Sequence, residues 1–101
     1  MELLIFLFKS GLSMEEIMKT SENRAEQYRK VQGLLQKFYV TDPSSGHVGG
    51  VFVFDSKENL KAFRDSELAK STGAAYKFSE PPSVRALEIA KVLHERACIV
   101  T

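Results

Sequence analysis

Three side chains that can hold an anion or move a proton lie near the middle of the chain, at Lys37, Tyr39 and His47. Lys37 and Tyr39 are two residues apart in an extended pattern, so both point to the same face of a strand. A buried ammonium is costly without a partner, which makes Lys37 a candidate for stabilising a substrate oxyanion or binding a carboxylate. Tyr39 is a candidate hydrogen-bond donor to the same ligand. An imidazole exchanges protons near neutral pH, so His47 is a candidate for proton transfer.

Each of these residues also has a purely structural interpretation, and the sequence leaves both interpretations open. The stem of Lys37 could cover apolar surface while its ammonium reaches water. Tyr39 could be a packing residue with its hydroxyl at the rim of the domain. His47 follows a turn and could be a solvated loop residue.

Recognised cofactor and metal signatures are absent from the sequence. There is no nucleotide-binding glycine fingerprint before a helix and no phosphate loop. His47 and His94 are the only histidines and Cys98 is the only cysteine, so a zinc site built from these residues is not expected. We therefore expect no cofactor and no metal.

The composition predicts one folded domain over residues 1–101. The net charge of +1 gives no general attraction to nucleic acid or to an anionic membrane. Because Cys98 has no partner for an internal disulfide, we expect a reducing compartment and a cytoplasmic location. The apolar run Leu3–Phe8 is too short to span a bilayer or to serve as a secretion signal.

The periodicity of apolar residues predicts the order strand, helix, strand, strand, helix, strand. Ser13 and Glu16 form a capping-box pattern at the start of the first helix. Dense turn residues at 42–46 predict a hairpin between the second and third strands. We expect strands over residues 3–8, 34–41, 48–54 and 84–93, and helices over residues 13–30 and 55–73.

The last of these segments is ambiguous. The alternation of Leu87, Ile89 and Leu93 favours a strand, whereas the spacing of Val84, Leu87 and Ala90 also fits a helix. We favour the strand because the three earlier strands need a partner.

This element order is typical of the α+β ferredoxin-like fold, a four-stranded antiparallel sheet with both helices on one face. The strands at 3–8 and 48–54 are apolar on both sides, so the uncovered face would expose a large apolar surface. A second copy stacked on that face would bury it, and we therefore expect a homodimer.

The same arrangement predicts an apolar pocket for a small apolar or aromatic ligand. Glycines inside a strand often mark a place where another group approaches the backbone closely, as at Gly49-Gly50. The candidate pocket-lining residues, for which plain core packing is the alternative, are Phe6, Gly50, Phe52 and Phe54.

Two runs of residues carry a resemblance to a known family: GLLQKFY at residues 33–39 and HVGGVFVFDSKE at residues 47–58, followed by Ala62-Phe63. The chain resembles the YdhR-type putative mono-oxygenases of the dimeric α+β barrel superfamily, alongside the antibiotic biosynthesis monooxygenases. The strongest part covers about residues 33–75. The resemblance implies a sheet-to-sheet dimer, an apolar pocket in each subunit and mono-oxygenase activity.

Oxygenation without a cofactor needs a substrate whose own carbanion passes an electron to oxygen. The protein then supplies a base, hydrogen bonds for the substrate anion and a dry cavity. Three functions remain open: a cofactor-independent mono-oxygenase or isomerase acting on a small aromatic or polyketide-like molecule, a non-catalytic dimer that binds such a ligand, and a structural dimer whose cavity is filled.

Overall fold

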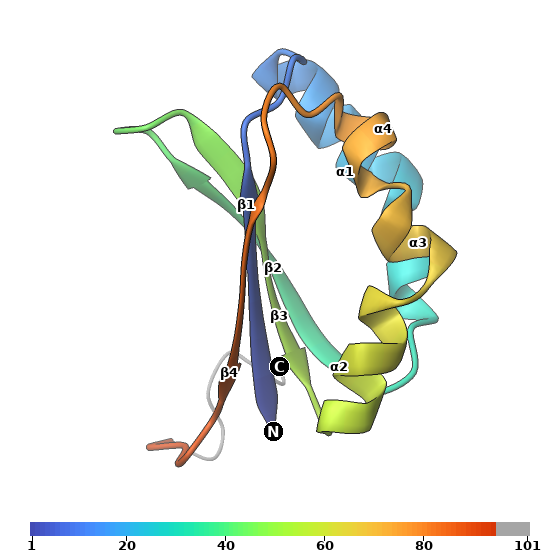
Figure 1. Ribbon diagram of the computed structural model, residues 1–101, viewed down its shortest axis with the longest axis vertical. Coiled ribbons are helices and arrows are strands. Elements are labelled where there is room, and N and C mark those ends of the chain that lie inside the picture. Colours follow the sequence, from blue (N-terminus) through green and yellow to red (C-terminus); the bar gives the residue numbers. More distant parts are fainter. Residues whose placement is uncertain (95–101) are drawn as a thin grey trace.

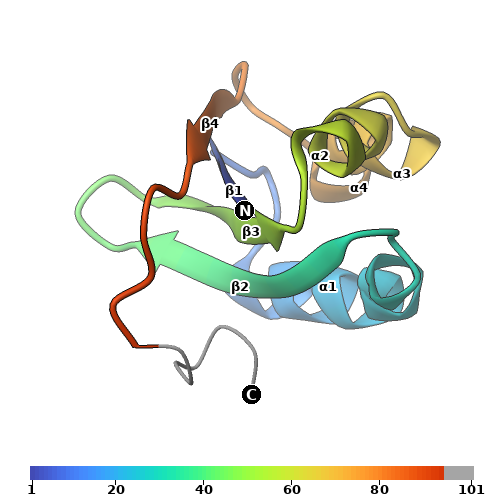
Figure 2. The same cartoon turned by 90° about the horizontal axis from the view of Figure 1, so that it is seen from below.

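In the computed structural model, which describes residues 1–94, four antiparallel strands form one sheet with helices on one of its faces (Figures 1 and 2). The strand order β2-β3-β1-β4 confirms the predicted ferredoxin-like fold. Cys98 lies outside the described residues. The elements are β1 (Glu2–Phe8), α1 (Met14–Arg29), β2 (Leu34–Asp42), β3 (His47–Phe54), α2 (Lys57–Arg64), α3 (Glu67–Lys70), α4 (Thr72–Tyr76) and β4 (Ser83–Glu88).

Helix α1 begins at the predicted capping box. The backbone N–H of Glu16 donates to Ser13 Oγ at 3.2 Å, and Ser13 N–H donates to Glu16 Oε1 at 3.0 Å. These two bonds satisfy amides that have no partner inside the helix. The helix then buries Ser21 and Tyr28 against the rest of the domain.

The second helical region differs from the single helix expected over residues 55–73, because it is divided into α2, α3 and α4. Ser66 adopts an extended backbone conformation, and its hydroxyl accepts the Ala69 N–H at 3.2 Å. A serine that caps a new turn in this way interrupts the helix before it. Gly73 does not end the region but lies within α4, which ends at Tyr76 and is followed by Lys77 with φ 51°.

Strand β2 departs from the strict alternation expected over residues 34–41. Its pairing with β3 shifts register between Leu34 and Gln36, where Leu35 is an extra residue in a β-bulge. As a result, Leu34 and Lys37 pair with Phe54 and Phe52, and both point to the helix side of the sheet.

The last strand is shorter than the expected 84–93. It pairs with β1 from Ser83 to Glu88, and Ile89 N–H makes a final hydrogen bond to the Met1 carbonyl. The strand ends there because its partner β1 begins at Glu2. The alternative helix over this segment is not formed.

The two faces of the sheet have different surroundings. Between the sheet and the helices lies an aromatic and aliphatic core cluster. Among residues 1–94, no helix lies on the opposite face (Figure 2), yet this face is also apolar, with Phe38, Val51 and Ile5 adjacent across three strands. The core cluster consists of Leu4, Tyr28, Phe52, Phe54, Leu60 and Phe63.

Candidate functional site

A cavity of about 480 Å³ lies between the sheet and the helices. Ligand pockets of small-molecule binding proteins have volumes of this order. Of the four residues expected at the wall, Phe6, Gly50 and Phe52 lie along the cavity. Phe54 lies instead in the core, fully buried, with its ring centroid 5.6 Å from that of Phe63.

The cavity opens to solvent between α1 and β2. Met14 and Met18 of α1 line it and are 49% and 47% exposed, and Tyr39 of β2 is 46% exposed. A flexible methionine side chain adapts to ligands of different shape. A small apolar molecule can therefore reach the cavity through a rim that is itself apolar.

Lys37 projects from β2 into this cavity. Its Nζ lies 3.3 Å from the ring centroid of Tyr28, 4.3 Å from that of Tyr39 and 4.9 Å from that of Phe52. Within residues 1–94, no carboxylate forms an ion pair with it. The amine thus lies among aromatic rings without an anionic partner from the described chain.

Two opposing effects set the charge of Lys37. Burial, with a smaller contribution from the nearby charge of Arg24, lowers the pKa of Lys37 to about 7. The faces of the surrounding rings favour the ammonium form and act in the opposite direction. Near neutral pH, both the neutral amine and the ammonium are therefore accessible.

The tyrosines of the cavity are hydrogen-bond donors at neutral pH. Burial raises the pKa of Tyr39 above its ordinary value, and burial raises the pKa of Tyr76 to about 12. The hydroxyl of Tyr28 accepts a hydrogen bond from Arg24 Nη2 at 3.4 Å. Both Tyr39 and Tyr76 line the cavity and keep their phenolic protons.

Sequence reasoning missed Tyr28 and Tyr76 as cavity residues. Tyr28 belongs to α1 and Tyr76 to α4, and neither lies near the Lys37–Gly50 region in the sequence. Arg24 of α1 helps to bring these helices together, since its Nη2 donates to Thr72 Oγ1 of α4 at 3.4 Å. The local signal that could have found Tyr28 is its place on the buried side of α1.

The charged groups along the cavity all have one sign. Among the lining residues in the described part of the chain there is no aspartate, glutamate or histidine. The basic residues that line it are Lys37, Arg64 and Lys70. This surface favours an anion over a cation as the ligand.

The glycine pair has two separate roles. A Cβ atom on Gly49 would lie 1.8 Å from the carbonyl oxygen of Phe6, so β1 and β3 pair at this point only around a glycine. A Cβ atom on Gly50 would lie 3.2 Å from Cε of Lys37 and 3.0 Å from the ring of Phe52. Gly50 therefore provides the space that the lysine stem occupies.

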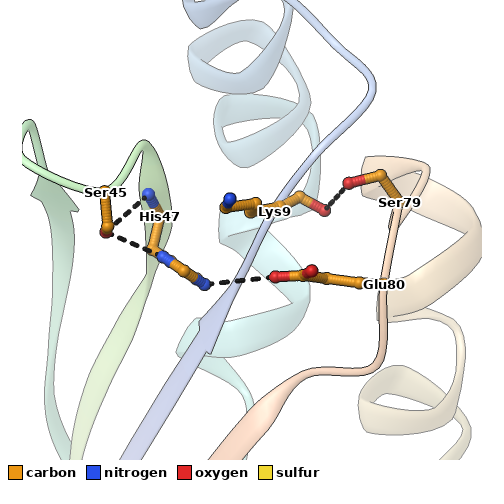
Figure 3. A network of polar contacts seen from close by, with 5 residues as sticks. All are labelled: Lys9, Ser45, His47, Ser79 and Glu80. Atoms are coloured by element: carbon orange, nitrogen blue, oxygen red, sulfur yellow. Dashed lines mark hydrogen bonds and ion pairs between the residues drawn. The ribbon is translucent and has the colours of Figure 1, made fainter.

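The structure does not bring His47 together with Lys37 and Tyr39. His47 points to the open face of the sheet, where its Nε2 lies 3.4 Å from Glu80 Oε1 and its Nδ1 lies 2.7 Å from Ser45 Oγ (Figure 3). The contact between His47 and Glu80 connects the start of β3 to the segment that precedes β4. A catalytic role for His47 stays a prediction.

Two further classes of feature are not found in residues 1–94. No group of three or more histidine, cysteine or acidic side chains is placed to hold a metal ion. None of the described helices combines the length and apolar character needed to cross a membrane.

Comparison with solved structures shows the same fold in several bacterial proteins. A putative antibiotic biosynthesis monooxygenase from Caulobacter crescentus is 17% identical over 89% of this chain and 90% of that chain, with a TM-score of 0.72. A protein of the same description from Deinococcus radiodurans is 14% identical over 93% and 97%, with a TM-score of 0.72. A dimeric ferredoxin-like protein of unknown function from Thermobifida fusca is 12% identical over 87% and 90%, with a TM-score of 0.68.

A search of curated proteins found no match. Comparison with protein families gives a more specific result than the comparison with solved structures. The family model described as "Putative mono-oxygenase ydhR" matches residues 3–80. This match runs from the second residue of β1 through α4 and therefore includes most of the cavity wall. The chain belongs to the ydhR family of putative mono-oxygenases.

Proposed function

We propose that the protein is a cofactor-independent mono-oxygenase or isomerase that acts on a small aromatic or polyketide-like molecule in the cavity beside Lys37. The observation that carries the proposal is a half-buried amine among aromatic rings, without a described carboxylate partner, in an apolar cavity. The family match supports an oxygenation reaction.

Lys37 is the base in this proposal. Its neutral amine accepts the proton of an acidic phenol or enol, and the ammonium that results pairs with the substrate anion. The Tyr39 hydroxyl donates a hydrogen bond to the same oxygen. The apolar walls exclude water, which strengthens both interactions.

Oxygenation then draws all its electrons from the substrate. The substrate carbanion reduces dioxygen, one oxygen atom becomes bonded to that carbon, and the other leaves as water. An activated methylene group is thereby converted to a carbonyl group. The protein contributes proton transfer, orientation and a dry site. Without oxygen, the same proton abstraction leads to isomerisation.

The protein acts as a homodimer in this proposal. The open face of the sheet is apolar along its central row, and apolar patches of this kind are seldom left exposed. A second copy covers the same residues by a two-fold contact. The similar protein from Thermobifida fusca is described as dimeric, which supports this arrangement.

The alternative function is a dimer that binds such a ligand without turnover. This function is favoured because the aromatic rings of the cavity enclose one amine, that of Lys37. The described lining residues include no carboxylate or imidazole that could act as a second proton-transfer group. The third possibility, a structural dimer with a filled cavity, is disfavoured by the open volume of about 480 Å³.

Oxygen uptake with a panel of quinols and activated methylene compounds tests the proposal. We expect turnover by the parent protein and at least about a hundredfold loss in Lys37→Met, the range for removing a general base. Tyr39→Phe should reduce the rate less. Lys61→Met, at an exposed position on α2, is the control and should keep the parent rate, while His47→Ala tests the separate prediction of a catalytic role for His47.

Two outcomes would contradict the proposal. Tight ligand binding by the parent protein with no oxygen uptake and no isomerised product indicates the binding function instead. Loss of turnover in His47→Ala with full turnover in Lys37→Met places the chemistry outside the cavity.

A further inference from the structure

The amine of Lys37 has a second chemical capacity besides proton transfer. A lysine nitrogen attacks a carbonyl carbon only in its neutral form, and enzymes obtain that form by placing the amine in an apolar pocket. Lys37 has these surroundings, because its nearest neighbours are the rings of Tyr28, Tyr39 and Phe52.

We propose that Lys37 captures small apolar aldehydes and ketones as a Schiff base inside the cavity. The proposal goes beyond the oxygenation reaction and does not depend on it. It rests on the placement of the nitrogen in a cavity that a ligand can enter past Met14, Met18 and Tyr39.

The balance of the reaction needs no further reactant. The nitrogen lone pair forms a bond to the carbonyl carbon, and the carbonyl oxygen becomes a hydroxyl group. That hydroxyl leaves as water with the second hydrogen of the amine, and a carbon–nitrogen double bond remains. Tyr39, whose ring lies 4.3 Å from Nζ, is a nearby proton donor for the departing oxygen.

Lys70 provides an internal comparison. It also lines the cavity, but its side chain is exposed to solvent. If the cavity only concentrates carbonyl compounds, Lys70 and Lys37 should react at similar rates. If the apolar surroundings create the nucleophile, only Lys37 should react.

The size and polarity of the cavity define the ligand class. A volume of about 480 Å³ with aromatic walls suits an aldehyde or ketone that carries a phenyl ring or a short alkyl chain. The basic residues along the wall disfavour a carbonyl compound that also carries a cation. Benzaldehyde is therefore a suitable probe.

Reductive trapping tests the proposal. The full chain is incubated at pH 7 with benzaldehyde and cyanoborohydride in the absence of oxygen, and modified lysines are identified by peptide mass spectrometry. We expect one benzyl group on Lys37, formed about tenfold or more faster than on any other lysine. Lys37→Arg should lose this fast reaction, while Lys61→Arg, at an exposed position on α2, should keep it.

Two results would overturn the proposal. One is benzylation of the parent protein spread evenly over its exposed lysines. The other is a fast reaction that persists in a folded Lys37→Arg variant. Should that variant fail to fold, the peptide map of the parent protein still decides between Lys37 and the surface lysines. Because oxygen is excluded, the result is separate from success or failure of the oxygenase assay.

Discussion

At the residue scale, the properties of Lys37 depend on what surrounds it. A lysine in water is charged up to a pH near 10, but the interior of this domain offers its ammonium only aromatic faces. Burial disfavours this ammonium and lowers the pKa of Lys37 to about 7. The ammonium form of Lys37 therefore lowers the stability of the fold, and lysines with such a lowered pKa are more frequent in functional sites than elsewhere.

The pH dependence of stability follows from this shift. Between pH 7 and 10.5 the unfolded chain holds a proton on Lys37 that the folded chain has released, so the free energy of unfolding rises with pH. Below pH 7 both states are protonated and the full cost of burial remains.

We therefore expect Lys37→Met to stabilise the fold more at pH 6 than at pH 9, by about 2 kcal/mol. Urea denaturation at the two pH values measures the difference. Lys61→Met, at an exposed position on α2, is the control and should show no such pH dependence. An equal effect of Lys37→Met at both pH values would contradict the burial of a titrating amine.

The two adjacent glycines should respond differently to alanine. Gly50→Ala adds a methyl group 3.2 Å from Lys37 Cε, so the flexible lysine stem is displaced while the fold remains. Gly49→Ala places a methyl group 1.8 Å from a backbone oxygen of β1 and should cost about 3 kcal/mol or more.

Stability and Lys37 benzylation are measured together on both glycine variants. Gly50→Ala should slow the benzylation of Lys37 with only a small loss of stability. The main effect of Gly49→Ala should instead be a large loss of stability. The reverse pattern would show that Gly50, and not Gly49, maintains the pairing of β1 with β3.

At the element scale, short polar side chains decide where the helices begin and end. Ser13 and Glu16 close the first turn of α1, and Ser66 divides the second helical region. The division matters for the cavity because α2 contributes Phe63 to its wall and α4 contributes Tyr76.

We expect Ser13→Ala to lower the free energy of unfolding by about 1 kcal/mol, since the Glu16 amide loses its acceptor. Thermal or urea denaturation measures the change. Asn23→Ala, at an exposed position on the same helix, should leave stability nearly unchanged. Equal effects of the two substitutions would mean that the capping box contributes nothing measurable.

At the scale of the whole molecule, the sheet is apolar on both faces and the helices cover one. The central row of the open face runs through Phe38, Val51 and Ile5 to Arg85 at the edge. Because these side chains point away from the cavity, the proposed dimer contact and the proposed site can be altered independently.

Val51→Lys should convert the dimer to a monomer, because it places an unpaired charge at the centre of the contact. Light scattering should give twice the chain mass of 11.3 kDa for the parent and that mass for the variant. Ala62→Lys, on the exposed side of α2, should remain dimeric. A parent protein with the mass of one chain at micromolar concentration would exclude the dimer.

The sequence by itself determined the order of elements and the fold. The apolar run at residues 3–8, the capping box at Ser13 and the turn residues at 42–46 are local signals, and each acts through neighbours in the chain. The alternation around Lys37 and Tyr39 likewise predicted that the two side chains share a face. These features need no knowledge of distant contacts.

Only the tertiary structure decided what surrounds the amine. Tyr28 and Phe52 contact Lys37 from different elements. The bulge at Leu35 shifts the register of β2, so that Leu34 and Lys37 lie on the same face of the sheet. His47 is close to Gly50 in sequence yet points to the opposite face of the sheet. The charge state of a buried group depends on contacts between segments far apart in the chain, and no local pattern encodes these.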